Sequence, residues 1–489
     1  MSPDTILLLV IVLFLVLLAC ETPVAWALAA SGALGIMLLR SPEMVTSLLG
    51  NSPYRTSSNY TLAIIPMYVL LGMFALHGRL AERLYRVASR ALHRLPGGLG
   101  IATVCACAGF AAVTGSSVAT AATIGKVSIG EMRRFGYPPS LAAGIVAAAG
   151  TLGILIPPSV VIVIYGVLAQ ESIARLLVAG IIPGLLSALV YGLFILVLGR
   201  NIRTDPEAGL RGVLDSTAGG GARSGPTGAN SPGDTSAGDT ATAAAGTVIA
   251  ATADDGQIEL RDPESVTRLQ AARALIWIGV VFAVVVTGIY SGLFTVIESG
   301  AIAALVGLVM LLSENMADGL RATSRKLLHA LVETASVTSM TFSILIGATI
   351  LSTFLVMTRV PMRFTDWVLS LDVPPLMILV ALLLTLILLG MVLETLSILI
   401  ICVPLMHPAV TALGFDGIWF AILVVKMIEI GMITPPVGIN VFVVSAASGV
   451  TVEKAFRGVL PFVLAELCVV ALLIAFPWLV TWLPSTIVG

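Results

Sequence analysis

Two stretches of this sequence place small, polar side chains inside regions that are otherwise strongly apolar. The first is GSSVATAATIG, residues 115–125, and the second is GMVLETLSILI, residues 390–400. Serine and threonine hydroxyls are neutral oxygen donors, and such oxygens can replace the water shell of an alkali cation. Ser116, Ser117 and Thr395 are therefore candidate ligands of an alkali cation. Hydroxyls that only let membrane helices pack closely are the alternative, and it stays open.

Each of these stretches is followed by an apolar segment that a double proline interrupts. The segments are GTLGILIPPS, residues 150–159, and GMITPPVGIN, residues 431–440. Proline removes a hydrogen-bond donor and clashes with the preceding turn, so carbonyl oxygens are released inside the membrane. Such a break survives only where protein or water covers it, and two matched breaks favour a binding site over a simple kink. The predicted helix breaks are Pro157, Pro158, Pro435 and Pro436, and the predicted cation ligands are Ser116, Ser117, Gly153, Thr395, Gly431 and Thr434.

Ionisable residues within apolar segments are candidates for substrate contact or coupling. Lys426 and Glu429 are three residues apart on one predicted helix and favour a structural ion pair, with a coupling role as the alternative. Glu394 has no cation close in sequence and is the better functional candidate. Arg359 precedes the second hairpin and either meets an anionic substrate at the outer mouth or anchors a helix at the interface. The predicted substrate-binding residues are Glu394, Arg359, Ser116, Thr395 and Asn440.

The composition of the chain indicates that these residues lie within a membrane protein. Of the 489 residues, 58% are hydrophobic and 11% charged, the mean hydropathy is +1.05, and long apolar runs recur throughout. These properties predict an all-α polytopic membrane protein. The net charge of −1 gives no basic field for nucleic acid, and five scattered cysteines indicate neither a disulfide framework nor a metal cluster. No phosphate-binding loop, HExxH or GxSxG motif is complete, so we do not expect an enzyme or an ATP-driven pump.

The positions of the basic residues predict the topology. Arginines precede 101–125, and Lys126, Arg133 and Arg134 follow it, so both of its ends belong on the cytoplasmic side and the segment is a re-entrant hairpin. The stretch 374–406 lacks basic flanks and re-enters from the outside. The first apolar run has no basic leader and is interpreted as a retained span. The predicted spans lie at about 4–20, 24–40, 61–77, 141–168, 176–199, 274–292, 297–313, 328–357, 417–446 and 459–485.

An internal repeat supports two halves of inverted topology. Shifted by 278 residues, 136–166 aligns with 414–444 at seven identities in 31, which include both double prolines. Five spans and one hairpin in each half place the two hairpins on opposite faces. We therefore expect a first membrane repeat at 1–203, a low-complexity cytoplasmic linker at 204–268 and a second membrane repeat at 269–489. The linker composition predicts disorder, with a docking role as a lesser alternative.

The long segment GSSVATAATIGKVSIGEMRRFGYPPSLAAGIVAAAGTLGILIPPSVVIVIYG and the shorter EIGMITPPVGINVFVVSAASG carry a family resemblance. Outside 204–268, nearly the whole chain resembles the large membrane subunit of a tripartite ATP-independent periplasmic (TRAP) transporter. The resemblance implies a multi-pass protein of the bacterial inner membrane that imports organic anions, usually carboxylates, with sodium ions as coupling ions and no other cofactor. It also implies two separate partners, a periplasmic substrate-binding protein and a small four-helix membrane subunit.

The resemblance further implies an elevator mechanism, in which the hairpins and broken helices slide against a scaffold of outer spans and basic amphipathic helices such as 78–95. The family's cation and substrate sites correspond to Ser116–Ser117 and Glu394–Thr395. Two departures are the long linker between the repeats and Glu394, which stands where an aspartate is common. A channel-like or scaffold membrane protein without coupled transport is the alternative function.

Overall fold

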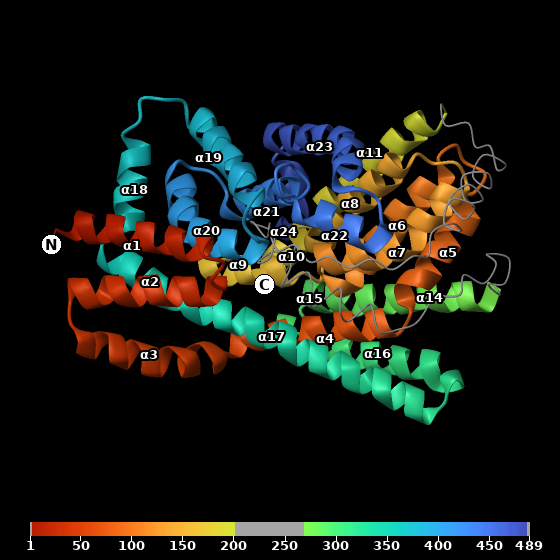
Figure 1. Ribbon diagram of the computed structural model, residues 1–489, viewed down its shortest axis with the longest axis horizontal. Helices are drawn as coiled ribbons and strands as arrows, with labels where there is room; N and C mark the ends of the chain where they lie inside the picture. Colours follow the sequence, from red (N-terminus) through yellow and green to blue (C-terminus); the bar gives the residue numbers. More distant parts are fainter. Residues whose placement is uncertain (1, 201–267, 487–489) are drawn as a thin grey trace, which may run out of the picture.

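The computed structural model describes residues 2–200 and 268–486, and the described residues form helices joined by short turns, without a β-strand. The predicted linker lies outside the described residues, except for Arg268 at its end. Figure 1 shows the helices of the two halves packed into one body. The first half contains α1 Pro3–Ala19, α2 Val24–Leu39, α3 Pro42–Ser57, η1 Tyr60–Ala63, α4 Ile64–His77, α5 Leu80–Leu92, α6 Gly98–Thr114, α7 Ser117–Arg134, α8 Pro139–Leu155, α9 Val160–Ala169, α10 Ile173–Ala179 and α11 Ile181–Gly199.

The second half repeats this order of elements. Its helices are α14 Arg268–Phe282, η3 Ala283–Thr287, α15 Gly288–Tyr290, α16 Val296–Asn315, η4 Met316–Asp318, α17 Leu320–Met357, α18 Val360–Leu369, α19 Pro375–Gly390, α20 Thr395–Ala412, α21 Gly417–Met432, α22 Ile439–Ser448, α23 Val452–Ala475 and α24 Trp478–Ser485. The 278-residue shift found in the sequence therefore relates helices along the whole described chain: α6 and α7 correspond to α19 and α20, and α8 and α9 correspond to α21 and α22.

The described helices confirm a polytopic membrane protein. By length and composition, seven could cross a membrane, among them α20 of the second hairpin, or up to eight if the pair α8–α9, bent by 47°, is one span. Every predicted span coincides with a helix or with consecutive helices, although α1 and α2, with 17 and 16 residues, are shorter than an average span. Five helical passages separate Arg134 from Arg363, so the two hairpins face opposite ways as predicted.

Both predicted hairpins are present as pairs of helices and are longer than predicted. The first consists of α6 and α7, which turn at Gly115 and Ser116 and pack against each other and against α8. Gly115 has φ +60°, a left-handed conformation that glycine adopts without strain, and the Ser116 hydroxyl caps α7 by accepting from Ala119 N at 3.4 Å. The second consists of α19 and α20, joined by residues 391–394. Pro375 suits the first turn of α19, where no N–H is needed.

Some of the helices outside the hairpins and the broken helices form a frame that we call the scaffold, α1–α4 and α14–α17. Its longest member, α17, has 38 residues and measures about 57 Å at 1.5 Å per residue. Figure 1 shows it running along the molecule from beside α16 to α18. Its counterpart in the first half is interrupted between α3 and α4. The sequence prediction missed α3, which packs against α2 and α17, and began α17 eight residues late, at 328.

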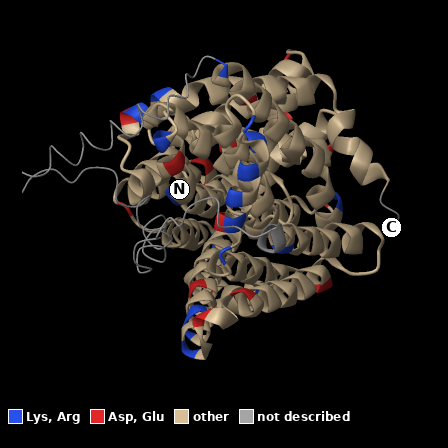
Figure 2. Cartoon of the chain, turned by 90° about the vertical axis from the view of Figure 1, so that its right-hand side faces the viewer, with Lys and Arg blue, Asp and Glu red and all other residues tan. Residues whose placement is uncertain are grey.

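One end of the scaffold carries a network of ion pairs, and its basic residues predict that this is the cytoplasmic end. Arg83 of α5 pairs with Glu314, and Asp318 lies 3.3 Å from Arg79 and 2.8 Å from Lys326. Figure 2 looks onto this end and shows charged residues gathered on it. The network fastens the amphipathic helix α5 to α16 and α17. At the opposite end, which we call the outer end, Arg363 of α18 pairs with Asp4.

Candidate functional site

The tip of the first hairpin lies directly on the break between α8 and α9. A Cβ atom at Gly153 would lie 2.6 Å from the carbonyl oxygen of Ser116, and one at Gly115 would lie 2.4 Å from that of Pro158. Neither distance leaves room for a side chain, because the obstructing atoms are backbone atoms. The glycines therefore allow the hairpin tip and the broken helix to present their backbone oxygens within one small region.

The second hairpin approaches its own break in the corresponding way. A Cβ atom at Gly431 would lie 2.7 Å from the Cα atom of Gly390, the last residue of α19. Thr395, the first residue of α20, places its hydroxyl 2.9 Å from the Met432 sulfur. Thr434, inside the break, donates its hydroxyl to the carbonyl of Ile430 at 2.6 Å. Each break also contains a cis peptide bond between its two prolines.

A hydrogen bond between the two halves joins the two regions. Asn440, in the first turn of α22, donates its Nδ2 to the hydroxyl of Ser117 at the start of α7. Both side chains are buried, and α22 packs against both α7 and α8. The Oδ1 atom of Asn440 and the hydroxyl of Ser397 are buried without a hydrogen-bond partner among the described residues. A buried polar atom without a partner is costly, so both oxygens are available to a ligand.

Hydroxyl groups extend this polar region along the first hairpin. Thr120 donates its hydroxyl to the Ser116 carbonyl at 2.7 Å, and its oxygen lies 3.2 Å from the hydroxyl oxygen of Thr114. All three residues belong to the tip that meets Gly153. Among the described residues, no group of three or more His, Cys, Asp or Glu side chains lies together as a metal site. Neutral oxygens therefore dominate the chemistry of the hairpin tips, and such oxygens suit a hard monovalent cation.

The structure divides the predicted site residues into three locations. Ser116, Ser117, Gly153 and Asn440 come together at the first tip, whereas Thr395, Gly431 and Thr434 surround the second. Glu394 is the residue before α20 and is partly exposed, and its side chain makes no capping hydrogen bond. Arg359 joins neither group: it lines a pocket at the outer end together with Arg40 and Arg363.

A buried charge cluster beside the second break was only partly predicted. The expected pair of Lys426 and Glu429 is present at 3.3 Å, but Lys426 lies closer, 2.6 Å, to Glu466 of α23. Lys426 also donates to the hydroxyl of Ser187 in α11 at 3.0 Å. All four side chains are buried. A lone acidic residue inside the apolar run 459–485 was the available signal, because charges in membrane helices rarely lack a partner.

A second buried contact that the sequence analysis missed ties the second hairpin to the first half. His407 of α20 lies 3.0 Å from the Tyr165 hydroxyl of α9 and 3.4 Å from the Glu171 carboxylate. The same carboxylate would lie 2.2 Å from a Cβ atom at Gly417, the first residue of α21. The sequence gives no periodic signal for this contact, because its members lie on elements far apart in the chain.

Hairpins whose tips meet broken helices, arranged in two halves of a polytopic helical protein, define a class of secondary transporter. The comparison with known families agrees. The chain belongs to the family described as "Tripartite ATP-independent periplasmic transporter, DctM component", whose model matches residues 11–479. The family resemblance noted in the sequence is thereby confirmed.

Two curated relatives match this chain over most of their length. The chain is 34% identical over 461 residues to the C4-dicarboxylate TRAP transporter large permease protein DctM of Pseudomonas aeruginosa, covering 94% of this chain and 92% of that protein. It is 28% identical over 433 residues to the sialic acid TRAP transporter large permease protein SiaM of Vibrio cholerae, covering 88% of each. The solved structure of the Alcanivorax borkumensis YdaH transporter shares the fold, with a TM-score of 0.56 and 14% identity, covering 90% of this chain and 89% of that chain.

Proposed function

We propose that this chain is the membrane subunit through which an organic anion, a carboxylate, enters a bacterial cell across the inner membrane by symport with sodium ions. The anion is delivered by a periplasmic substrate-binding protein, and a small membrane subunit completes the complex. Membership of the TRAP family supports this proposal, as do the names of relatives, which refer to C4-dicarboxylates and sialic acid.

The observation that carries the proposal is the close approach of each hairpin tip to a broken helix. The first cation site consists of the Ser116 and Ser117 oxygens with the backbone at Gly153, and the second consists of Thr395 and Thr434 with the backbone at Gly431. In both sites, glycine allows a backbone separation that no other residue permits. Because the hairpin tip and the broken helix lie this close together, their carbonyl and hydroxyl oxygens can surround a dehydrated sodium ion.

The substrate belongs between the two tips, where the halves meet. Asn440 already contacts Ser117 and keeps its Oδ1 atom without a partner, so it can accept a hydrogen bond from a substrate hydroxyl or a protonated group. Ser116 and Thr395 supply donors for a carboxylate. Glu394 lies at the rim of the second tip, and its carboxylate repels an anionic substrate. The bound cations offset this repulsion, so they also neutralise the charge of the substrate.

In the proposed mechanism, one part of the protein moves against another during transport. The unit that moves contains both hairpins and both broken helices, and the scaffold supplies the fixed frame. Arg359 belongs to the outer end of the scaffold, so it meets the substrate only in the position of the moving unit that opens outward. The work comes from the sodium gradient, about 2.3 kcal/mol per charge per 100 mV plus the concentration difference.

The test is transport in liposomes that contain the complete complex, with the binding protein outside and an imposed sodium gradient. Ser117→Ala and Thr395→Ala each remove one oxygen ligand, which costs about 1–3 kcal/mol and moves the sodium activation curve roughly 5- to 150-fold to higher concentration. Ser128→Ala is the matched control: this buried serine of α7 donates only to the Ile124 carbonyl, at 2.8 Å. Uptake that continues without sodium, or that needs no binding protein as in a channel, contradicts the proposal.

A further inference from the structure

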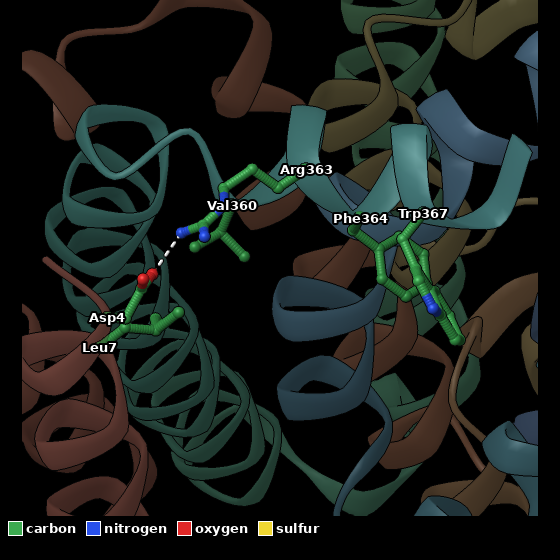
Figure 3. Close-up of a pocket in the computed structure, with 6 residues that line it drawn as sticks. All are labelled: Asp4, Leu7, Val360, Arg363, Phe364 and Trp367. Carbon is green, nitrogen blue, oxygen red and sulfur yellow. Dashed lines mark hydrogen bonds and ion pairs between the residues drawn. The ribbon is translucent and has the colours of Figure 1, made fainter. Parts of the chain in front are cut away.

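Two adjoining pockets lie at the outer end of the scaffold, where α1 begins, α2 ends and α17 is followed by α18. They share one lining residue, Arg363. The larger pocket, about 600 Å³, is lined by Pro3, Leu39, Arg40, Met357, Thr358, Arg359 and Arg363. The smaller pocket, about 320 Å³, is lined by Asp4, Leu7, Val360, Arg363, Phe364 and Trp367 (Figure 3).

The larger pocket is strongly basic. Three arginines line it and no carboxylate does. Arg363 pairs with Asp4, which belongs to the smaller pocket, whereas Arg40 and Arg359 have no ion-pair partner in the part of the chain that the structure describes. Unpaired guanidinium groups around one cavity favour an anion with several oxygens, because each guanidinium can donate two parallel hydrogen bonds.

The location of these arginines needs an explanation. Basic residues are depleted from the outer loops of membrane proteins. In the described residues, the outer loops and helix ends of this chain carry arginines at 40, 55, 175, 359 and 363. Three of these five meet in one cavity: Arg359 and Arg363 lie close together in the sequence, and Arg40 comes from a distant part of it. A shared ligand accounts for this convergence, whereas anchoring of single helices at the interface does not require it.

The smaller pocket adds an apolar surface to the basic one. Figure 3 shows Phe364 and Trp367 on one side and Leu7 with Asp4 on the other, with Arg363 reaching across to Asp4. The adjacent surface is apolar and exposed, because Leu8 of α1 and Met362 of α18 are each 63% exposed, and Trp367 is 56% exposed. Exposed tryptophan and apolar side chains beside arginines are typical of the boundary between headgroups and acyl chains.

We propose that the two pockets together bind one anionic phospholipid. Its phosphate lies in the larger pocket against Arg40 and Arg363, and one acyl chain lies along Leu7, Phe364 and Trp367. A soluble carboxylate would use the basic pocket but gains nothing from the apolar one. The lipid bridges α1, α2 and α18, and so holds the outer end of the scaffold together. Among the described residues, the only ion pair at this end is that of Asp4 and Arg363.

The experiment measures binding of short-chain phosphatidylglycerol to the delipidated full chain in detergent, by native mass spectrometry and by thermal stabilisation. We expect Arg40→Gln, alone and with Arg363→Gln, to weaken binding about tenfold or more. Arg55→Gln, an exposed arginine of α3 outside the pockets, is the matched control. Trp367→Ala should also weaken binding, whereas Trp482→Ala, equally exposed at 56%, should not. Arg359 is left unchanged because it is a candidate substrate contact.

Three results would overturn the proposal. The first is stabilisation by glycerol phosphate or succinate equal to that by the lipid, which would show a site for a free anion. The second is equal weakening by Arg55→Gln, which would show non-specific attraction to charge. The third is unchanged lipid binding by Arg40→Gln, a variant that breaks no described ion pair and therefore should fold normally. None of these outcomes depends on sodium or on transport, so they leave the proposed function to its own test.

Discussion

Replacing Lys426 by methionine should destabilise the protein strongly. In the buried cluster, one ammonium group faces two carboxylates, at 2.6 Å and 3.3 Å, so its formal charge is −1. Lys426→Met leaves two buried carboxylates facing each other without a cation. Breaking a buried ion pair in this way costs about 3–5 kcal/mol, because the remaining charge has neither water nor a partner.

Glu429→Gln tests the same charge count in the opposite direction. It keeps the 2.6 Å contact between Lys426 and Glu466 and brings the formal charge to zero, so we expect stability equal to or above that of the unchanged protein. The double variant Lys426→Met with Glu429→Gln retains one carboxylate and should fall between the two single variants. Such a rank order cannot arise from side-chain volume, because methionine and glutamine are close in size to the residues that they replace.

The assay is thermal unfolding of the purified chain in detergent, followed by intrinsic fluorescence, with size-exclusion chromatography to confirm a single species. Lys454→Met is the control, because Lys454 is an exposed lysine of α23. An unfolding midpoint for Lys426→Met equal to that of the control would refute the reasoning. It would mean that the two carboxylates tolerate each other without the ammonium group.

Two further predictions concern the first hairpin and the segment between the repeats. Gly153→Ala should abolish sodium-dependent uptake in the liposome assay, because its Cβ atom would lie 2.6 Å from the carbonyl oxygen of Ser116. Gly130→Ala on α7 should be neutral, because a Cβ atom there would meet no neighbouring atom within 4 Å. Normal uptake by Gly153→Ala would show that transport does not need the close contact between the hairpin tip and the broken helix. Deleting residues 216–255 should leave uptake and membrane levels unchanged, because this composition cannot form a packed core, and lost uptake at normal levels would reveal a function in the segment.

The positions of the double prolines and of the basic residues were enough to predict much of the architecture. Double prolines marked both breaks, and the arginines around 101–125 marked a hairpin, because backbone satisfaction and charge placement constrain membrane helices strongly. α3 was missed because it is too polar to resemble a span. Its start signal was present, since Ser41 caps the helix and Pro42 occupies its first turn.

Contacts between the halves could not be predicted in the same way. Asn440 and Ser117 are 323 residues apart, and Lys426 and Ser187 are 239 apart, so only the packing of the two repeats brings them together. The aligned halves differ at these positions as well: the 278-residue shift places Ala148 opposite Lys426. Arg359 was recognised from the sequence as a candidate anion contact. The sequence did not show that Arg40 and Arg363 line the same pocket.

The matching order of helices in two oppositely facing halves bears on the origin of the chain. Duplication and fusion of a half-length protein that entered the membrane in both orientations would produce two such halves. Insertion in both orientations requires nearly equal basic charge at the two ends of the spans. The five arginines between residues 79 and 94, against two at 359 and 363, therefore record changes that accumulated after fusion fixed each copy in one orientation. Fusion freed each copy to acquire residues suited to one side of the membrane, which a half-length ancestor with mixed orientation could not do.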